Sequence, residues 1–282
     1  MIMRKTGIAA AGLVLAATAA VGLAQQGPAS APAPMATTVP VPARASIMAG
    51  GYLPRGAAPD SLVLLPPPPA PGSAAFARDR EAAQAAVALQ GSARWEQAAI
   101  DADLFAPNST DVFSCAAGVK IGADTTPRLN ALLRRMGPDL ALAVYPTKRK
   151  YQRPRPFTVN HRPTCTPRDE ALLRTDGSYP SGHSAIGYGW GLVLAEIFPD
   201  RAAQLVARGR AFGDSRRVCN VHWLSDVEEG RVMATVVVAR LHAEPNFRDD
   251  VAAARAEVRA PFVPLAVPDC ARENAALAAT GG

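Results

Sequence analysis

The chain has 282 residues, a formal net charge of +6 and 49% hydrophobic residues. This length and apolar content exclude a low-complexity protein and permit one large or two small folded domains. The modest basic surplus argues against nucleic acid as the main partner, and we expect a small anionic ligand instead.

The N-terminus has the pattern of a secretory signal peptide. Arg4 and Lys5 form a short basic region, an uncharged apolar run follows over 7–23, and Gly22-Leu23-Ala24 offers the small residues that a signal peptidase reads. The alternative is a retained membrane anchor, because the apolar run is at the lower edge of the length that spans a bilayer. We predict a signal peptide over 1–24 and a periplasmic or secreted protein that is free of the membrane after cleavage.

A segment rich in proline and alanine comes next. Between Gln25 and Gly72 the chain holds 12 of its 26 prolines, which neither continue helices nor donate to a β-ladder. We predict a flexible tail over 25–59 and one folded domain over 60–265. Residues 266–282 are predicted to form a C-terminal tail.

Apolar residues recur at helical spacing through the rest of the chain, and alternating strand patterns are almost absent. Predicted helices cover 73–89, 94–103, 126–135, 139–146, 184–198, 200–213, 223–242 and 247–259. The segment 184–198 is nearly all apolar, so it is predicted to be a central buried helix. The sequence therefore predicts an all-α, single-domain helical bundle.

Four cysteines, Cys115, Cys165, Cys219 and Cys270, favour two disulfides in an exported protein. Their spacing contains no CxxC pair of the kind typical of zinc sites, so we expect no metal site. Our preferred pairing is Cys165 with Cys219, which would brace the chain around Cys219. Four cysteines allow three pairings, and the sequence does not choose among them.

The first candidate binding motif contains Lys148 and Arg155. Pro154 and Pro156 hold the backbone at Arg155 extended, which suggests a side chain directed at a specific ligand. A solvated basic face is the plain alternative, and it is our interpretation of the two basic residues that follow Lys148.

The second motif, Pro180-Ser181-Gly182-His183, directly precedes the predicted buried helix. Ser181 can cap that helix and Gly182 lets the backbone approach a ligand, while free N–H groups at a helix start form an anion site. A bound dianion would raise the pKa of His183 and favour the protonated form, which can donate to a leaving group. An ordinary capped helix with a solvent-facing histidine is the alternative.

The third motif contains Arg216, His222 and Asp226. Ser225 and Glu228 have the spacing of a capping box, which places a helix start near His222. The i,i+4 spacing of His222 and Asp226 lets the carboxylate accept from one ring nitrogen and leaves the other free to attack phosphorus. A structural His–Asp pair is the alternative for this motif alone.

Together the three motifs resemble the superfamily of type 2 phosphatidic acid phosphatases, vanadium-dependent haloperoxidases and bacterial class A non-specific acid phosphatases. Gly177-Ser178-Tyr179-Pro180-Ser181-Gly182-His183 is similar to the class A signature, with Ser184 in place of the more usual threonine. Leu64-Leu65-Pro66-Pro67-Pro68-Pro69, Arg94-Trp95 and Asp101-Ala102-Asp103-Leu104 are similar to the class A N-terminal region. The resemblance covers roughly residues 60–255.

The resemblance implies an acid phosphatase that hydrolyses small phosphate monoesters and could also transfer phosphate to alcohols. In this chain His222 would attack phosphorus and form a phosphohistidine, His183 would protonate the leaving alcohol, and Asp226 would orient His222. The expected phosphate-binding residues are Lys148, Arg155, Ser181, Gly182 and Arg216. The family needs no metal and no cofactor, and it suggests a homo-oligomer.

The chain departs from the family pattern at Asp214 and Arg217, where relatives often have an uncharged amide and an apolar residue. Asp214 would either weaken phosphate affinity or pair with Arg217. His161 and His242 lie outside the motifs and are interpreted as structural.

The alternative function is a vanadium-dependent haloperoxidase, since vanadate bound by these residues would resemble the phosphoryl transition state. A membrane lipid phosphatase is disfavoured, because no later segment is long and apolar enough to span a bilayer. A phosphate-binding protein without turnover would need no paired histidines.

Overall fold

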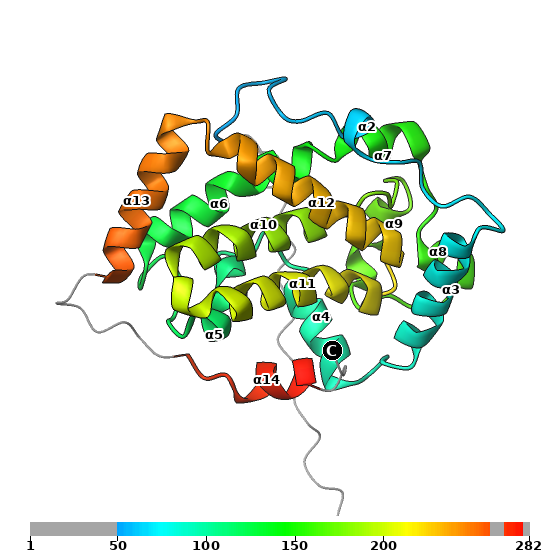
Figure 1. Cartoon of the computed structure of the whole chain (residues 1–282). Helices are drawn as coiled ribbons and strands as arrows, with labels where there is room; N and C mark the ends of the chain where they lie inside the picture. The colour runs from blue at the N-terminus through cyan, green and yellow to red at the C-terminus, as the bar shows by residue number, and fades with distance from the viewer. Residues whose placement is uncertain (1–49, 260–267, 279–282) are drawn as a thin grey trace, which may run out of the picture. The chain divides into compact units, whose positions relative to one another are not determined.

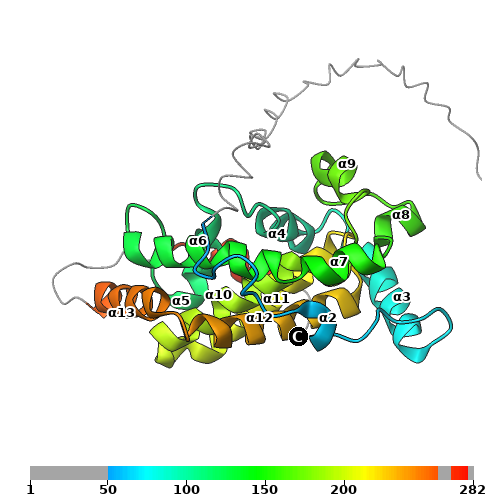
Figure 2. The same cartoon turned by 90° about the horizontal axis from the view of Figure 1, so that it is seen from above.

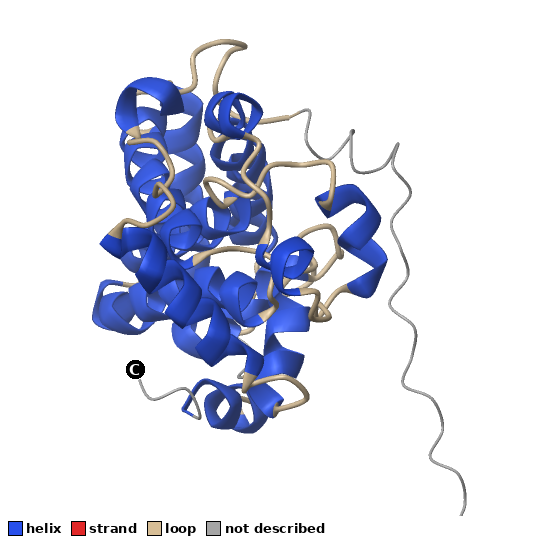
Figure 3. Ribbon diagram, turned by 90° about the vertical axis from the view of Figure 1, so that its right-hand side faces the viewer, coloured by secondary structure: helices blue, strands red, loops and turns tan. Residues whose placement is uncertain are grey.

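The structure is a computed structural model that describes residues 50–259 and 268–278, all within one compact unit over Val39–Gly282. The predicted signal peptide and residues 25–49 of the predicted tail lie outside the described residues. Within the described ranges the regular elements are helices, without a strand (Figure 3). The all-α prediction is therefore confirmed.

Short and medium helices fill the first half of the described chain. They are α2 (Ser61–Leu64), α3 (Ala74–Val87), α4 (Ala93–Asp101), η1 (Ser109–Phe113), α5 (Ser114–Ala117), α6 (Pro127–Leu142), α7 (Tyr145–Tyr151), α8 (Pro156–Asn160), η2 (Pro167–Asp169) and α9 (Glu170–Leu173). Longer helices follow. They are α10 (Gly182–Ile197), α11 (Ala202–Val218) after the short η3 (Pro199–Arg201), α12 (Leu224–Leu241), α13 (Pro245–Arg259) and α14 (Ala271–Ala278).

Helix α10 lies at the centre of the bundle. It packs against α6, α11 and α12, and Figure 1 shows it running between α11 and α12, with the same group seen from above in Figure 2. Its side chains Ala185, Val193 and Leu194 are fully buried. The prediction of a buried central helix is confirmed, and burial of such apolar side chains is the main stabilising contribution of the core.

Helices α10 and α11 form an antiparallel pair whose backbones approach closely. A Cβ atom on Gly191 would lie 2.8 Å from the carbonyl oxygen of Leu205, and one on Gly209 would lie 2.9 Å from that of Gly187. Only glycine fits at these crossings. Because the pair is antiparallel, the first turn of α10 lies beside the last turn of α11, which brings the second and third motifs together.

One predicted helix break, between 126–135 and 139–146, is wrong. Helix α6 continues through Pro138, which lacks the N–H needed for the helical hydrogen-bond ladder. The flanking side chains Leu133, Met136 and Leu140 are fully buried. Their burial on both sides of the proline outweighs the lost hydrogen bond.

Helix α11 is longer than predicted, because it passes Gly213 and ends at Val218. A Cβ atom on Gly213 would lie 3.0 Å from Ser184 Oγ. Gly213 is therefore a packing residue and not a helix stop. The extension matters for the site, because Arg216 becomes part of the last turn of α11.

The end of the predicted N-terminal tail is packed against the bundle. The backbone N–H groups of Tyr52 and Leu53 donate to the carboxylate of Asp139, at 2.7 and 3.1 Å, and the Tyr52 ring meets Phe247 edge-on. The described residues from Gly50 onward thus differ from the flexible segment that their composition indicates.

The predicted C-terminal tail contains a helix. Helix α14 packs against α4, and Glu273 accepts from Arg208 Nε of α11 at 3.0 Å. The disulfide Cys115–Cys270 ties the start of α14 to α5. The second disulfide is Cys165–Cys219, so the preferred pairing is confirmed.

Replacing Cys165 and Cys219 together by alanine should lower the free energy of unfolding by about 4 kcal/mol, because the bridge closes a loop with a sequence separation of 54 residues. Urea unfolding of the oxidised double variant and the wild type measures this difference. The Cys115→Ala/Cys270→Ala variant, which removes the other disulfide, is measured in the same way for comparison. Equal stability of wild type with and without reductant would contradict the prediction.

Candidate active site

Backbone hydrogen bonds join the second and third motifs. Ser181 N donates to the carbonyl oxygen of Asp226 at 2.9 Å, and His222 N donates to that of Arg216 at 3.3 Å. The first bond ties the residue before α10 to the first turn of α12. The second fixes the spacing between the end of α11 and the histidine. The proposed nucleophile, orienting carboxylate and binding arginine are thus held by main-chain contacts.

His222 and Asp226 form the pair that the third motif predicts. His222 is 3% exposed and Asp226 is fully buried. His222 Nδ1 lies 3.2 Å from Asp226 Oδ2, and Nε2 lies 3.1 Å from Arg155 Nη1. Because an ionised carboxylate only accepts, Nδ1 carries the hydrogen, and the lone pair is on Nε2. That nitrogen is the one available for attack.

The local structure that creates this pair differs from the predicted capping box. Helix α12 begins at Leu224, and its N-cap is Trp223, whose backbone N–H donates to Asp226 Oδ2 at 2.8 Å. Ser225 and Glu228 form no such pair, so that part of the prediction is wrong. A carboxylate three residues after the N-cap satisfies one of the free N–H groups of a helix start. Asp226 therefore caps the helix and binds the histidine with one oxygen.

Arg153 and Asp79 hold the other side of Asp226, and the motifs did not identify either residue. Arg153 Nη1 donates to Asp226 Oδ1 at 2.6 Å, and Nη2 donates to Asp79 Oδ2 at 2.6 Å. Asp79 also accepts from Ser225 N at 2.7 Å. Burial raises the pKa of Asp226, and Arg153 is the largest opposing cause. Arg153 therefore favours an ionised Asp226 in a site closed to water.

The surroundings of both candidate histidines, His183 and His222, favour their neutral forms in the ligand-free protein. Burial, followed by the charge of Arg216, holds the pKa of His183 well below its usual range. Burial, followed by Arg155, does the same for the pKa of His222. His183 Nε2 lies 3.0 Å from the carbonyl oxygen of Ala102, so Nε2 carries the hydrogen. Nδ1 is left to take up and release a proton.

Two of the three guanidinium nitrogens of Arg216 have no internal hydrogen-bond partner. Arg216 is 1% exposed, and its Nε and Nη1 are buried without a hydrogen bond to any described residue. Burial lowers its pKa to about 10, which still leaves it charged near neutral pH. A buried unpaired cation is costly, so this position is suited to an anionic ligand.

Lys148 and Arg155 lie on the other side of His222. Lys148 is in the last turn of α7 and is 4% exposed; its pKa is lowered to about 8, first by burial and then by Arg155. Arg155 has the extended backbone expected between its prolines, with ψ of 154°. Both side chains contact Asp176, as Arg155 Nη2 lies 3.0 Å and Lys148 Nζ 3.4 Å from its Oδ2.

Ser181 caps α10 as predicted, because its Oγ accepts from Ser184 N at 3.2 Å. Its own N–H is engaged by Asp226, so the amides that can serve an anion are those of Gly182 and His183. Neither amide has an acceptor among the described residues. They are the first two N–H groups of a helix with 16 residues, where the dipole favours negative charge.

The residues that depart from the family pattern pair with each other. Asp214 Oδ1 lies 3.2 Å from Arg231 Nη2 and 3.9 Å from Arg217 Nε. Its charge is balanced by these two cations of α11 and α12. His242 pairs with Glu196 at 3.3 Å, and His161 ends α8 with a left-handed φ of 54°. These contacts support the structural interpretation of both histidines.

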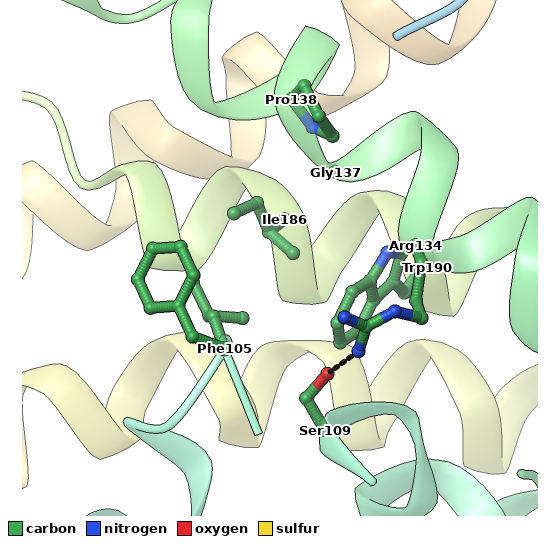
Figure 4. Close-up of a pocket in the computed structure, with 8 residues that line it drawn as sticks. Phe105, Ser109, Arg134, Gly137, Pro138, Ile186 and Trp190 are labelled. Atoms are coloured by element: carbon green, nitrogen blue, oxygen red, sulfur yellow. Dashed lines mark hydrogen bonds between the residues drawn. The ribbon is translucent and has the colours of Figure 1, made fainter. Parts of the chain in front are cut away.

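A small pocket lies against α10, beside Ile186 and Trp190 (Figure 4). It is lined by Leu104, Phe105, Ser109, Arg134, Gly137, Pro138, Ile186 and Trp190. Ile186 and Trp190 share a face of α10 with His183, because residues at i, i+3 and i+7 lie along one side of a helix. Leu104 follows Ala102, the acceptor for His183. The walls of this pocket are mainly apolar.

Within residues 50–259 and 268–278 no group of three or more His, Cys, Asp or Glu side chains could hold a metal ion. The charged groups near His222 include the carboxylate of Asp226, which it contacts, and three cations that lower its pKa, Arg155, Lys148 and Arg216. A site built from cations and neutral histidines suits an anion that accepts hydrogen bonds on several oxygens.

Comparison with known proteins places the chain in a family. Residues 137–249 match the model of the PAP2 superfamily. The chain is 43% identical over 202 residues to a non-specific acid phosphatase of Salmonella typhi, covering 71% of this chain and 80% of the relative. It is 42% identical over 207 residues to the non-specific acid phosphatase of Providencia stuartii, covering 73% and 84%.

A third relative is named an acid phosphatase, from Zymomonas mobilis, with 39% identity over 210 residues, or 74% of this chain and 80% of the relative. The match to the family model, over residues 137–249, includes all three motifs. The chain belongs to the PAP2 superfamily, among the non-specific acid phosphatases.

Proposed function

We propose that this protein is an acid phosphatase that hydrolyses small phosphate monoesters through a phosphohistidine on His222. The observation that carries the proposal is the juxtaposition of His222, whose Nδ1 is held by Asp226 and whose Nε2 meets the cation Arg155, and the buried Arg216 whose Nε and Nη1 lack partners. The relatives are named phosphatases, and nothing in the site favours the haloperoxidase alternative over that chemistry.

The reaction has two displacements. His222 Nε2 attacks phosphorus, the bond from phosphorus to the ester oxygen breaks, and His183 gives a proton from Nδ1 to the leaving oxygen. Water then attacks phosphorus, its proton passes to His183, and the bond from phosphorus to nitrogen breaks. An alcohol in place of water would give phosphate transfer instead.

The cations act on the charge of the phosphoryl oxygens. Lys148, Arg155 and Arg216 surround His222, and the amides of Gly182 and His183 add the positive end of α10. Such fixed donors stabilise the transition state without reorganisation, which is the largest contribution in most phosphoryl transfers. Ser181 Oγ retains its own hydrogen and can donate to the same anion. Asp226 stabilises the positive charge that develops on His222.

Acid conditions suit this cycle. In the free protein His183 is neutral because burial and Arg216 lower its pKa. A bound phosphoryl dianion offsets the charge of Arg216 and so raises the pKa of His183, which then binds a proton. Substrate binding thus promotes the protonation of His183 that cleavage of the substrate needs. A lower pH favours this protonation.

We also propose that the protein is exported to the periplasm or secreted, and that it assembles as a homo-oligomer. Two disulfides favour an oxidising compartment. No described helix has both the length and the apolar character required to cross a bilayer. The apolar side chains Leu62, Val63 and Leu64 of α2 are exposed, which supports a surface covered by a second copy.

Replacing His222 by alanine should lower kcat on an aryl phosphate by at least about 1000-fold, because it removes the nucleophile. Wild-type protein quenched in alkali should carry labelled phosphate from a labelled substrate, and the variant should carry none. His242→Ala is the control, since that histidine pairs with Glu196 at 3.3 Å outside the site. Retained turnover in His222→Ala would refute the proposal.

Anion binding at about pH 6 should be accompanied by proton uptake, because the anion raises the lowered pKa of His183 towards the solution pH. Sulfate is the probe, since its own charge does not change in this range. Calorimetry in buffers with different ionisation enthalpies counts the protons. The uptake should fall in His183→Asn; zero uptake in wild type, or uptake unchanged by the substitution, would contradict the assignment.

Replacing Arg153 by methionine should lower kcat by about 100-fold and change KM by less than about threefold. Its terminal nitrogens Nη1 and Nη2 are directed at Asp226, Ser225 and Asp79. Arg153 therefore acts on Asp226, which orients His222, and does not bind phosphate. Thermal melting must accompany the kinetics, because an unpaired buried carboxylate is destabilising.

Arg153→Lys keeps the charge and should recover part of kcat. The control is Arg149→Met, which removes an exposed cation of α7, next to Lys148. A large rise in KM with little change in kcat would show that Arg153 binds the phosphate directly.

A further inference from the structure

The donors around His222 fall into two sets. One set has no internal partner, namely Nε and Nη1 of Arg216 and the amides of Gly182 and His183. The other set consists of Lys148 and Arg155, whose charged groups are already in contact with the carboxylate of Asp176. An entering phosphate therefore finds one half of its site open and the other half engaged.

A single oxygen of Asp176 bridges the two cations. Asp176 Oδ2 lies 3.0 Å from Arg155 Nη2 and 3.4 Å from Lys148 Nζ. The other terminal nitrogen of Arg155, Nη1, is directed at Val221 O and His222 Nε2, at 3.0 and 3.1 Å. Arg155 Nη2 and Lys148 Nζ are thus the charged donors that a phosphate oxygen would need to share with Asp176.

We propose that Asp176 is an internal competitor of phosphate, a carboxylate that occupies Lys148 and Arg155 in the free enzyme and releases them when a phosphoryl group binds. The proposal rests on the proposed function, since it assigns the same cations to phosphate. A carboxylate oxygen and a phosphate oxygen on the same donors repel each other, so binding of one weakens binding of the other.

The side chain of Asp176 is partly exposed to solvent, while the backbone carbonyls beside it accept hydrogen bonds from the two cations. Its side chain is 30% exposed, against 5% for Lys148 and 2% for Arg155. The carbonyl oxygen of Asp176 accepts from Arg155 Nε at 2.9 Å, and that of Gly177 accepts from Lys148 Nζ. These carbonyls keep both cations in place after the carboxylate has turned to solvent.

The other carboxylate of the site cannot play this part. Asp226 is fully buried, and its two oxygens are held by Arg153, Trp223 N and His222. Among the described carboxylates that contact these cations, Asp176 is thus the one with access to solvent. Competition by Asp176 weakens the binding of inorganic phosphate, the product. When phosphate leaves Lys148 and Arg155, the carboxylate of Asp176 binds these donors again.

The test is the Asp176→Asn variant, which keeps the shape of the side chain and removes its charge. Calorimetry with inorganic phosphate gives Kd directly, and steady-state kinetics on an aryl phosphate give KM, kcat and the inhibition constant of phosphate. We expect Kd and the inhibition constant to fall by about tenfold, with KM falling in parallel. Because phosphate stays on longer, kcat should not rise.

Asp214→Asn is the matched control. It also removes one negative charge, two residues from Arg216, but Asp214 pairs with Arg231 and Arg217. We expect its Kd for phosphate to change by less than about twofold. An equal gain in both variants would mean that net charge alone is responsible and would overturn the proposal.

Unchanged or weaker phosphate binding in Asp176→Asn would also overturn it, and weaker binding would make Asp176 a positioning residue. The proposed function fails separately, when neither wild type nor variant turns over an aryl phosphate. In that case the calorimetric Kd still decides whether Asp176 competes with phosphate.

Discussion

The buried carboxylate of Asp226 is the group on which the rest of the site depends. One oxygen accepts from His222 and from the N-cap amide of α12, the other accepts from Arg153, and the backbone carbonyl accepts from Ser181 N. A buried ion costs several kcal/mol unless its oxygens are satisfied. The energetic need to satisfy Asp226 therefore fixes the start of α12, the start of α10 and the tautomer of His222 together.

The sequence predicted those features that depend on short-range spacing. His222 with Asp226, Ser181 as the cap of α10 and the extended backbone at Arg155 all follow from residues within a few positions of each other. The buried character of α10 was also readable, since its apolar run has no polar face. The sequence wrongly predicted that helices stop at Gly213 and before Pro138. At both positions tertiary packing overrides the local preference of glycine and proline.

The features that the sequence did not predict are contacts between distant residues. Asp79 meets Arg153 across 74 positions, and nothing in the surroundings of Asp79 on α3 distinguishes it from a solvated helix charge. Asp176 lies one residue before the signature and still gave no signal, because a loop carboxylate becomes meaningful only beside Lys148 and Arg155. Charge pairing of this kind is decided by the fold and not by spacing.

The site joins two demands that oppose each other. In the proposed mechanism His222 must be neutral to attack, and burial together with the three cations lowers its pKa in that direction. The same burial and cations keep His183 from holding a proton until an anion arrives. Since the charge of the substrate is what reverses the second effect, protonation of the acid is coupled to binding. In the proposed mechanism the acid preference therefore arises in the enzyme–substrate complex, because the free enzyme favours the neutral form of both histidines.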